Sequence, residues 1–242
     1  RSFDRAMPEE INRVVVDALA DLLLVTSPEG VDHLVREGVA AERIALVGNP
    51  MIDTLLKNLD RMKPESVRPL HGWPDRYAVV TLHRPSNVDD PTLAREIVDQ
   101  LLQLSATIPL VIPLHPRGAE RLGGLGLVDS ATASKQIKIL PPLGYIEFAS
   151  LVRGATLVVT DSGGVQEETT ILKVPCLTMR ENTERPITIT HGTNRLISPK
   201  QLAAAAAEVL GGRFVLPPEA PPLWDGAAGV RIAAVINDRY RS

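Results

Sequence analysis

Residues 156–168 read Thr-Leu-Val-Val-Thr-Asp-Ser-Gly-Gly-Val-Gln-Glu-Glu, and this stretch decides the fold. Its aliphatic start is typical of a buried strand. The turn Ser162-Gly163-Gly164 follows, and residues 165–172 then predict a helix. Two glycines let a phosphate approach the backbone, and the N–H groups and partial positive charge of a helix N-terminus attract anions. The stretch therefore favours a phosphate-binding strand–turn–helix unit, with a simple tight turn as the alternative.

Similar aliphatic runs recur along the chain, separated by segments of helical periodicity. We expect strands near residues 21–26, 43–48, 77–83, 109–115, 137–141, 156–161 and 174–179. Alternating strands and helices predict an α/β fold built on a parallel sheet. Proline followed by acidic residues, at Pro8 and at Pro28, predicts two helix starts.

Two segments rich in proline divide the chain. Residues 63–75 read as a linker, and residues 215–225 precede a last amphipathic helix near 226–240. We expect residues 1–66 to be the remnant of an N-terminal domain plus the start of the linker. Residues 67–225 should form a C-terminal parallel-sheet domain, and residues 226–242 a C-terminal helix that packs back toward the first part.

Composition excludes several classes of protein. The 242 residues carry a formal net charge of −3 with no basic stripe, so we do not expect nucleic acid as a partner. No run approaches the roughly 18 apolar residues that span a bilayer, and no basic-then-apolar leader precedes Pro8, so we expect no membrane partner. The only cysteine, Cys176, lies in an apolar run and is expected to be buried and unreactive. Since one cysteine allows no internal disulfide, these features predict a soluble, cytoplasmic protein.

Polar side chains follow several of the expected strands. Because parallel sheets bind ligands at the carboxyl ends of their strands, these side chains are candidates for a site. His83 with Arg84 follows one strand, and His115 follows another; such donors suit a pyrophosphate or a departing oxyanion. Arg185 precedes a proline, which holds it in an extended or turn geometry aimed at the same crevice. For each of these residues a purely structural or solvated role stays open.

Carboxylates are the remaining candidates. Glu168 lies four residues after Gly164, where its carboxylate could accept both hydroxyls of a ribose. Glu9 and Glu10 lie in the first turn of a helix, where they either complement the helix dipole or supply acid–base groups. The sequence shows no metal-ligand pattern and no serine or cysteine triad.

Together these motifs resemble the non-hydrolysing UDP-N-acetylglucosamine 2-epimerase family. The segments that carry the resemblance are PEEINR (8–13), GNPMID (48–53), TLHR (81–84), DSGGVQEE (161–168) and MRENTERP (179–186). Their order and spacing match over nearly the whole chain. The resemblance implies a GT-B architecture, with residues 67–225 as a UDP-binding Rossmann-like domain and residues 1–66 as part of a second one. It also implies interconversion of UDP-GlcNAc and UDP-ManNAc without a redox cofactor or a metal, and a possible homodimer.

The family's chemistry implies a role for each matching position. UDP is eliminated to leave 2-acetamidoglucal and is added back after C2 is reprotonated on the other face. The resemblance assigns Ser162, Gly163, Gly164 and Arg185 to the diphosphate, Glu168 to the ribose, Leu143 and Phe148 to uracil, His83 to departing UDP, Glu9 to catalysis, and His115 to a second, regulatory UDP-GlcNAc.

The chain also departs from the family pattern. Members begin with a strand and a glycine-rich loop carrying basic ligands, followed by an aspartate and a His-x-Glu-Ala-Gly segment, and residues 1–242 contain none of these. We therefore expect the chain to start near the end of the first domain. Two alternatives to an epimerase stay open: a UDP-binding fragment without catalysis, and a GT-B glycosyltransferase, against which the PEEINR block argues.

Overall fold

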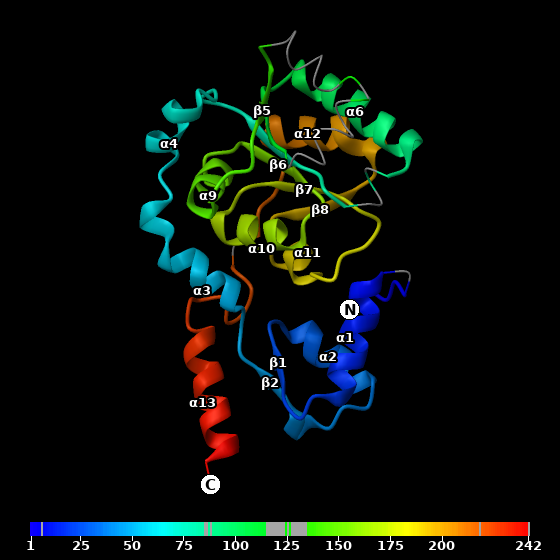
Figure 1. The fold of residues 1–242 in the computed structure, drawn as a ribbon, viewed down its shortest axis with the longest axis vertical. Helices are drawn as coiled ribbons and strands as arrows, with labels where there is room; N and C mark the ends of the chain where they lie inside the picture. Colours follow the sequence, from blue (N-terminus) through cyan, green and yellow to red (C-terminus); the bar gives the residue numbers. More distant parts are fainter. Residues whose placement is uncertain are drawn as a thin grey trace.

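The computed structural model describes residues 1–5, 7–84, 87, 89–114, 124, 126, 135–217 and 219–241. Within these ranges the chain forms two separate parallel sheets at opposite ends of the molecule (Figure 1). The smaller pairs β1 (Leu23–Val25) with β2 (Ile44–Leu46), and the larger has six strands.

The smaller sheet forms with two helices that begin where the sequence predicts. Helix α1 (Pro8–Leu19) and helix α2 (Pro28–Arg36) both carry proline and glutamate in their first turn. Helix α2 crosses between the two strands, and a 3-10 turn at Ala41–Arg43 leads into β2. The result is a strand–helix–strand unit, the crossover connection that parallel neighbouring strands need.

The larger sheet contains the strand that leads into the Ser162–Gly164 turn, for which the sequence predicts phosphate binding. Its strands are β3 (Ala78–Thr81), β4 (Leu110–Pro113), β5 (Ile137–Leu140), β6 (Leu157–Thr160), β7 (Cys176–Met179) and β8 (Asn194–Ile197). They lie in the order β5-β4-β3-β6-β7-β8, and every pair is parallel. This is the Rossmann order: the chain moves outward from β3 to one edge, then from β6 to the other. The reversal lies between β3 and β6, and ligands bind beside such a reversal at the carboxyl ends of the strands.

Helices cover both faces of this sheet. Helix α6 (Pro91–Ser105) and helix α12 (Leu202–Leu210) pack on one face, and helix α9 (Tyr145–Arg153) and helix α10 (Gly163–Leu172) on the other (Figure 1). A strand buried on both faces needs apolar residues throughout, which explains the continuous aliphatic runs.

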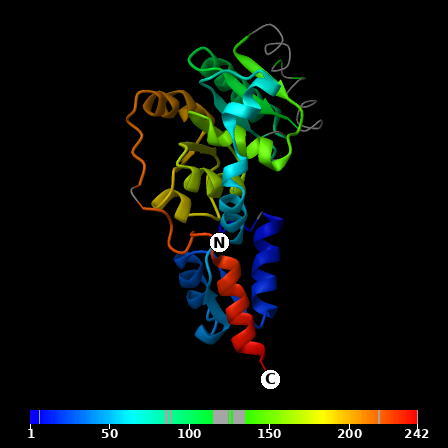
Figure 2. The ribbon, with the colours of Figure 1, turned by 90° about the vertical axis from the view of Figure 1, so that its left-hand side faces the viewer.

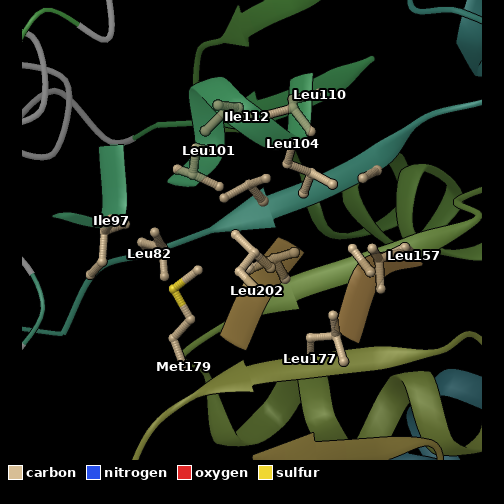
Figure 3. Packing of buried hydrophobic residues seen from close by; sticks show 14 of the residues in the cluster. Leu82, Ile97, Leu101, Leu104, Leu110, Ile112, Leu157, Leu177, Met179 and Leu202 are labelled. Atoms are coloured by element: carbon tan, nitrogen blue, oxygen red, sulfur yellow. The ribbon is translucent and has the colours of Figure 1, made fainter. Parts of the chain in front are cut away.

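Successive residues of β3 point to opposite faces of the sheet. Ala78 and Val80 belong to the cluster beneath α6 and α12, whereas Val79 belongs to the cluster beneath α9 and α10, and all three are fully buried. Figure 3 shows the first cluster, in which Leu101 of α6 and Leu202 of α12 pack with leucines of the strands. Cys176 is fully buried, as expected, and burial raises the pKa of its thiol to about 11.

The two sheets are connected twice. Helix α3 (Pro50–Lys57), a turn at Leu59–Arg61 and helix α4 (Pro64–His71) lead from one to the other. Helix α13 (Ala228–Tyr240) then returns from the larger sheet and runs alongside the smaller unit (Figure 2).

Helix α13 is fixed at both of its ends. The Asp53 carboxylate accepts the backbone N–H groups of Ala228 and Gly229, and Arg239 donates to the carbonyls of Glu42 (2.7 Å) and Asp21 (2.9 Å). These bonds join the last helix to Asp21, Glu42 and Asp53 of the first part of the chain. The exact domain limits at residues 66 and 225 stay predictions.

Two features differ from the sequence-based prediction. Residues 63–75 were expected to be a linker, yet Pro64–His71 form α4, which packs on α9. Helix α4 starts at Pro64 and ends at Gly72, whose φ of 58° is left-handed, so these two residues act as helix signals, whereas Pro69 lies inside the helix. Strand β8 was missed because it is a four-residue edge strand that begins with polar Asn194 and Arg195. Short elements are also present at Ile187–Thr190 (α11) and Pro199–Gln201.

No helix among the described residues is long and apolar enough to cross a membrane.

Candidate functional site

A buried carboxylate joins the two strands at the reversal point. Asp161 directly follows β6, and its side chain is fully buried. It accepts the backbone N–H groups of His83 (3.0 Å) and Arg84 (2.9 Å) and the side-chain amide of Asn87 (3.1 Å), all beyond the end of β3. These bonds hold the segment after β3 against the segment after β6.

His83 shares the same carboxylate through its ring. Its Nδ1 lies 2.8 Å from Oδ1 of Asp161, while 63% of the His83 side chain is exposed. The hydrogen bond to Asp161 raises the pKa of His83 above its ordinary value, although partial burial opposes the shift. Burial would raise the pKa of Asp161, but the bonds from His83 and Arg84 hold it below its ordinary value. The geometry thus favours a charged imidazolium that is anchored on one side and open on the other, which suits an anionic ligand.

The N-terminus of α10 lies beside this pair. Ser162 is its N-cap residue, and no side chain of the described residues caps the helix there. A Cβ added to Gly163 would lie 2.9 Å from Oε1 of Glu184, so this position accommodates only glycine without movement of Glu184. An uncapped helix N-terminus with glycine at its first position presents open N–H groups to an anion.

Arginines surround Glu184 near the start of α10. Arg180 donates to Glu184 at 2.7 Å, and Nη2 of Arg84 lies 3.5 Å from the same carboxylate. Burial alone would raise the pKa of Glu184, but the bond from Arg180 and the charges of Arg180 and Arg185 lower it to about 2. The site is therefore rich in positive charge, partly balanced by a carboxylate whose lowered pKa favours its ionised form.

Arg185 forms a second ion pair in the same loop. Its Nε lies 2.6 Å from Oε1 of Glu167 in α10, a carboxylate that is 2% exposed. Burial raises the pKa of Glu167 above its ordinary value, although the charge of Arg185 partly offsets this shift. Arg185 and Glu184 also line a hollow of about 360 Å³ together with Arg13 of α1, so the loop faces the smaller unit across a cleft.

The predicted ribose and uracil residues lie close together. Glu168 is buried at 6% exposure, and its carboxylate accepts the hydroxyl of Tyr145, the first residue of α9. Burial raises the pKa of Glu168 and that of Tyr145, the latter to about 12. Leu143 and Phe148 flank Tyr145 and pack against the buried cluster that contains Val165 of α10. The start of α9 and the first turns of α10 thus form one surface.

Helix α1 distinguishes the two adjacent glutamates. Glu10 is buried, accepts hydrogen bonds from N and Oγ of Ser2 (both 3.1 Å) and forms an ion pair with Arg13. Burial alone would raise the pKa of Glu10, but these bonds lower it below its ordinary value. Glu9 is exposed in the same turn. Glu10 therefore has a structural role, and Glu9 is the carboxylate of the pair that a ligand can reach. His115 lies outside the described residues.

Three contributors were not assigned a role from the sequence. Asp161, Glu184 and Tyr145 acquire their roles from contacts with residues far away in the chain. A signal was present for Asp161 alone, since an acidic residue directly after a buried strand is well placed to bind a neighbouring strand end.

A Rossmann-order sheet, joined to a second parallel sheet by a returning C-terminal helix, defines an α/β protein of GT-B type. The model of the UDP-N-acetylglucosamine 2-epimerase family matches residues 1–237, and the chain belongs to that family.

Known proteins of this family align with most of the chain. The UDP-N-acetylglucosamine 2-epimerase of Methanocaldococcus jannaschii is 39% identical over 244 residues, covering 98% of this chain and 66% of that protein. The UDP-2,3-diacetamido-2,3-dideoxy-D-glucuronate 2-epimerase of Pseudomonas aeruginosa is 37% identical, covering 81% of this chain and 54% of that protein. The crystal structure of the M. jannaschii enzyme in complex with UDP-GlcNAc and UDP superposes with a TM-score of 0.86 at 38% identity, covering 98% of this chain and 67% of that one. The chain thus spans just under two thirds of the first relative and about half of the second.

Proposed function

We propose that this chain supplies the UDP-binding side of an enzyme that interconverts UDP-GlcNAc and UDP-ManNAc. The observation that carries the proposal is the anchored His83–Asp161 pair beside the uncapped N-terminus of α10. Family membership over residues 1–237 supports an isomerase as the reaction class. The proposed elimination and re-addition of UDP uses no redox cofactor or metal.

The proposed contacts follow the charge distribution of the site. Ser162, Gly163 and Gly164 at the start of α10 hold the diphosphate together with Arg185, since helix N–H groups and a guanidinium both donate to phosphate oxygens. Glu168 accepts the ribose hydroxyls.

The uracil would lie against the start of α9. Leu143 and Phe148 offer it an apolar surface there.

The chemistry requires a group that stabilises the leaving diphosphate. Breaking the anomeric C–O bond places negative charge on UDP, which protonated His83, Arg185 and the N-terminus of α10 stabilise. Loss of the C2 proton gives 2-acetamidoglucal, and UDP adds back after C2 is reprotonated on the opposite face. Glu9, the exposed carboxylate of α1, is proposed to take part in that proton transfer.

The proposal extends to the protein's setting. We propose a homodimer located in the cytoplasm, with the UDP-sugar as its small-molecule partner and with His115 as a contact for a second, regulatory UDP-GlcNAc. Light scattering on the purified protein tests the homodimer.

Proton NMR of the full-length gene product with UDP-GlcNAc tests the reaction. We expect the anomeric signal of UDP-ManNAc to appear, and His83→Asn to slow its appearance. Exchanging His191, an exposed histidine whose ring contacts Thr190, is the matched control. No conversion by the wild-type protein contradicts the epimerase, and free UDP released only with an acceptor sugar indicates a glycosyltransferase instead.

A calorimetric titration of the 242-residue chain with UDP separates binding from catalysis. Binding without conversion supports the reading of this chain as a UDP-binding fragment. An unchanged affinity in Glu168→Ala removes the proposed ribose contact.

A further inference from the structure

Gln166 is a fully buried amide that contacts the phosphate-binding turn from inside. It lies in the first turns of α10 with 0% exposure. Its Nε2 donates to the carbonyl of Ser162 at 3.1 Å, and its Oε1 accepts the hydroxyl of Thr183 at 2.7 Å and the amide of Asn194 at 3.1 Å. One side chain therefore connects the N-cap of α10 to the loop after β7 and to β8.

The same bonds continue around the backbone of Arg185. Its N–H donates to Oγ1 of Thr183 at 3.0 Å, and its carbonyl accepts the hydroxyl of Thr188 at 2.7 Å. Asn194 then donates to Thr188 at 3.2 Å and returns the network to Gln166. The result is a closed ring of hydrogen bonds, which we name the Arg185 ring: Gln166, Thr183, Arg185, Thr188 and Asn194.

Burying the polar groups of the Arg185 ring costs free energy, which indicates that the ring has a function beyond packing. The side chains of Gln166, Thr183, Thr188 and Asn194 are 0%, 9%, 0% and 4% exposed. Apolar residues of similar volume would fill the same space without the need to satisfy polar groups. A fully satisfied polar network, unlike apolar packing, fixes one specific relative position of the segments it joins.

The segments joined here are those that the proposed function assigns to the diphosphate. We infer that Gln166 and Thr183 are positioning residues, which hold the Arg185 loop at a fixed distance from the Ser162–Gly164 turn so that both can contact one diphosphate. The inference rests on the proposed function. Neither side chain touches the ligand; each acts through the backbone of Ser162 or Arg185.

The test is Thr183→Val, which keeps the shape of the side chain but removes the hydroxyl between Gln166 and Arg185. Affinity is measured for UDP by calorimetry and for uridine by ligand-observed NMR titration. We expect affinity for UDP to fall about tenfold, because the two hydrogen bonds of the Thr183 hydroxyl that hold the Arg185 loop are lost, and affinity for uridine to stay within about twofold. Thr183→Ser, which retains the hydroxyl, should bind UDP as the wild type does.

Thr169→Val is the matched control. Thr169 is another fully buried threonine of α10, but its hydroxyl donates to carbonyls of Val165 and Gln166 within the helix. It should leave the affinity for both ligands unchanged, while thermal unfolding reports any loss of stability in each variant.

The outcomes separate the possibilities. Equal UDP affinity in Thr183→Val and wild type overturns the inference, and so does a parallel loss of UDP and uridine binding, which would show a general structural role. A wild-type chain that binds neither ligand overturns the proposed function, and the inference with it.

Discussion

His83 donates from Nδ1 to the carboxylate of Asp161 across 2.8 Å, and this bond joins the ends of two strands that are far apart in sequence. The carboxylate is completely buried, whereas most of the histidine side chain is exposed. Asp161 thus fixes the tautomer and orientation of the ring and favours its charged form. We therefore expect the stability of the protein to depend on pH through this pair.

Replacing His83 with glutamine should reduce stability most at mildly acidic pH. Since the folded-state pKa of His83 is raised above 6.5, its contribution is fully present below pH 6.5 and is lost as pH rises through the raised value. The folded-state pKa of Asp161 is lowered below 3.8. The contribution of Asp161 to the free energy of unfolding is therefore present above pH 3.8 and is lost as pH falls through the lowered pKa. Between pH 3.8 and pH 6.5 we expect His83→Gln to lower the free energy of unfolding by at most about 1 kcal/mol, because the histidine ring is solvent-exposed. Urea unfolding at pH 5.5 and 8.5 measures it.

His191→Gln provides the comparison for that experiment. His191 is exposed and its ring contacts the neutral hydroxyl of Thr190, so this variant should match the wild type at both pH values. A difference between His83→Gln and wild type that grows toward pH 8.5 would contradict the assigned direction of the pKa shift.

Asp161→Asn should destabilise the protein strongly. The new amide group would place a donor against backbone N–H groups of His83 and Arg84 that now donate to the carboxylate. We expect the free energy of unfolding to fall by about 3 kcal/mol, as for other buried charges removed from a satisfied network.

Asp90→Asn is the matched control for that change. Asp90 caps α6 by accepting the N–H groups of Thr92 and Leu93, a role that asparagine fills about equally well, so its effect should stay within about 0.5 kcal/mol. Chemical unfolding measures both variants, and equal urea midpoints for the two would show that Asp161 has no special role.

Much of the fold could be predicted because it follows from local patterns. Aliphatic runs buried on both faces identify β3, β4, β6 and β7, and proline with acidic residues identifies the starts of α1 and α2. Strand β8 could not be identified, because an edge strand that begins with Asn194 and Arg195 lacks the apolar pattern. Helix α4 was hidden because its prolines and Gly72 also occur in linkers.

The candidate site was predictable only in part. The turn at Ser162–Gly164 and the histidine after β3 could be recognised because each follows a strand directly. The contacts around them could not be predicted. The ion pair of Arg84 with Glu184, for example, joins residues that only the sheet order brings together. The resemblance assigns Glu9 to catalysis, but the burial of Glu10 by the residues around Ser2 could not be read from the sequence.

Gly163→Ala should weaken UDP binding with little change in stability. Its new methyl group would lie 2.9 Å from Oε1 of Glu184, which Arg180 holds in place, so the carboxylate must move within the proposed diphosphate site. We expect UDP affinity to fall at least about tenfold by calorimetry. Gly229→Ala in α13, where the added carbon meets its nearest neighbour at an ordinary 3.4 Å, should leave it unchanged. Unaltered affinity in Gly163→Ala would place the diphosphate elsewhere.

Glu168→Ala should remove the ability to distinguish ribose from deoxyribose. A buried carboxylate that accepts a sugar hydroxyl penalises a ligand lacking that hydroxyl, because the carboxylate then loses an acceptor bond in a poorly hydrated place. We expect the wild-type chain to bind UDP about tenfold more tightly than 2′-deoxy-UDP, and Glu168→Ala to bind both about equally.

Tyr145→Phe sharpens this test, because it removes the hydroxyl that donates to Glu168 but keeps the carboxylate. Without that donor the pKa of Glu168, already raised by burial, should rise further. As the pH is lowered, the Glu168 carboxylate of the variant is therefore protonated at a higher pH than that of the wild type. The preference for ribose should be lost at that higher pH. Exposed Glu65 on α4 supplies the control, and Glu65→Ala should keep the full preference. Calorimetric titrations with both nucleotides between pH 5.5 and 8 measure the effect. If Glu168→Ala keeps the preference for UDP over 2′-deoxy-UDP, another residue binds the ribose. If Glu168→Ala loses this preference and Tyr145→Phe loses it at a higher pH than the wild type, the two residues together form the ribose contact.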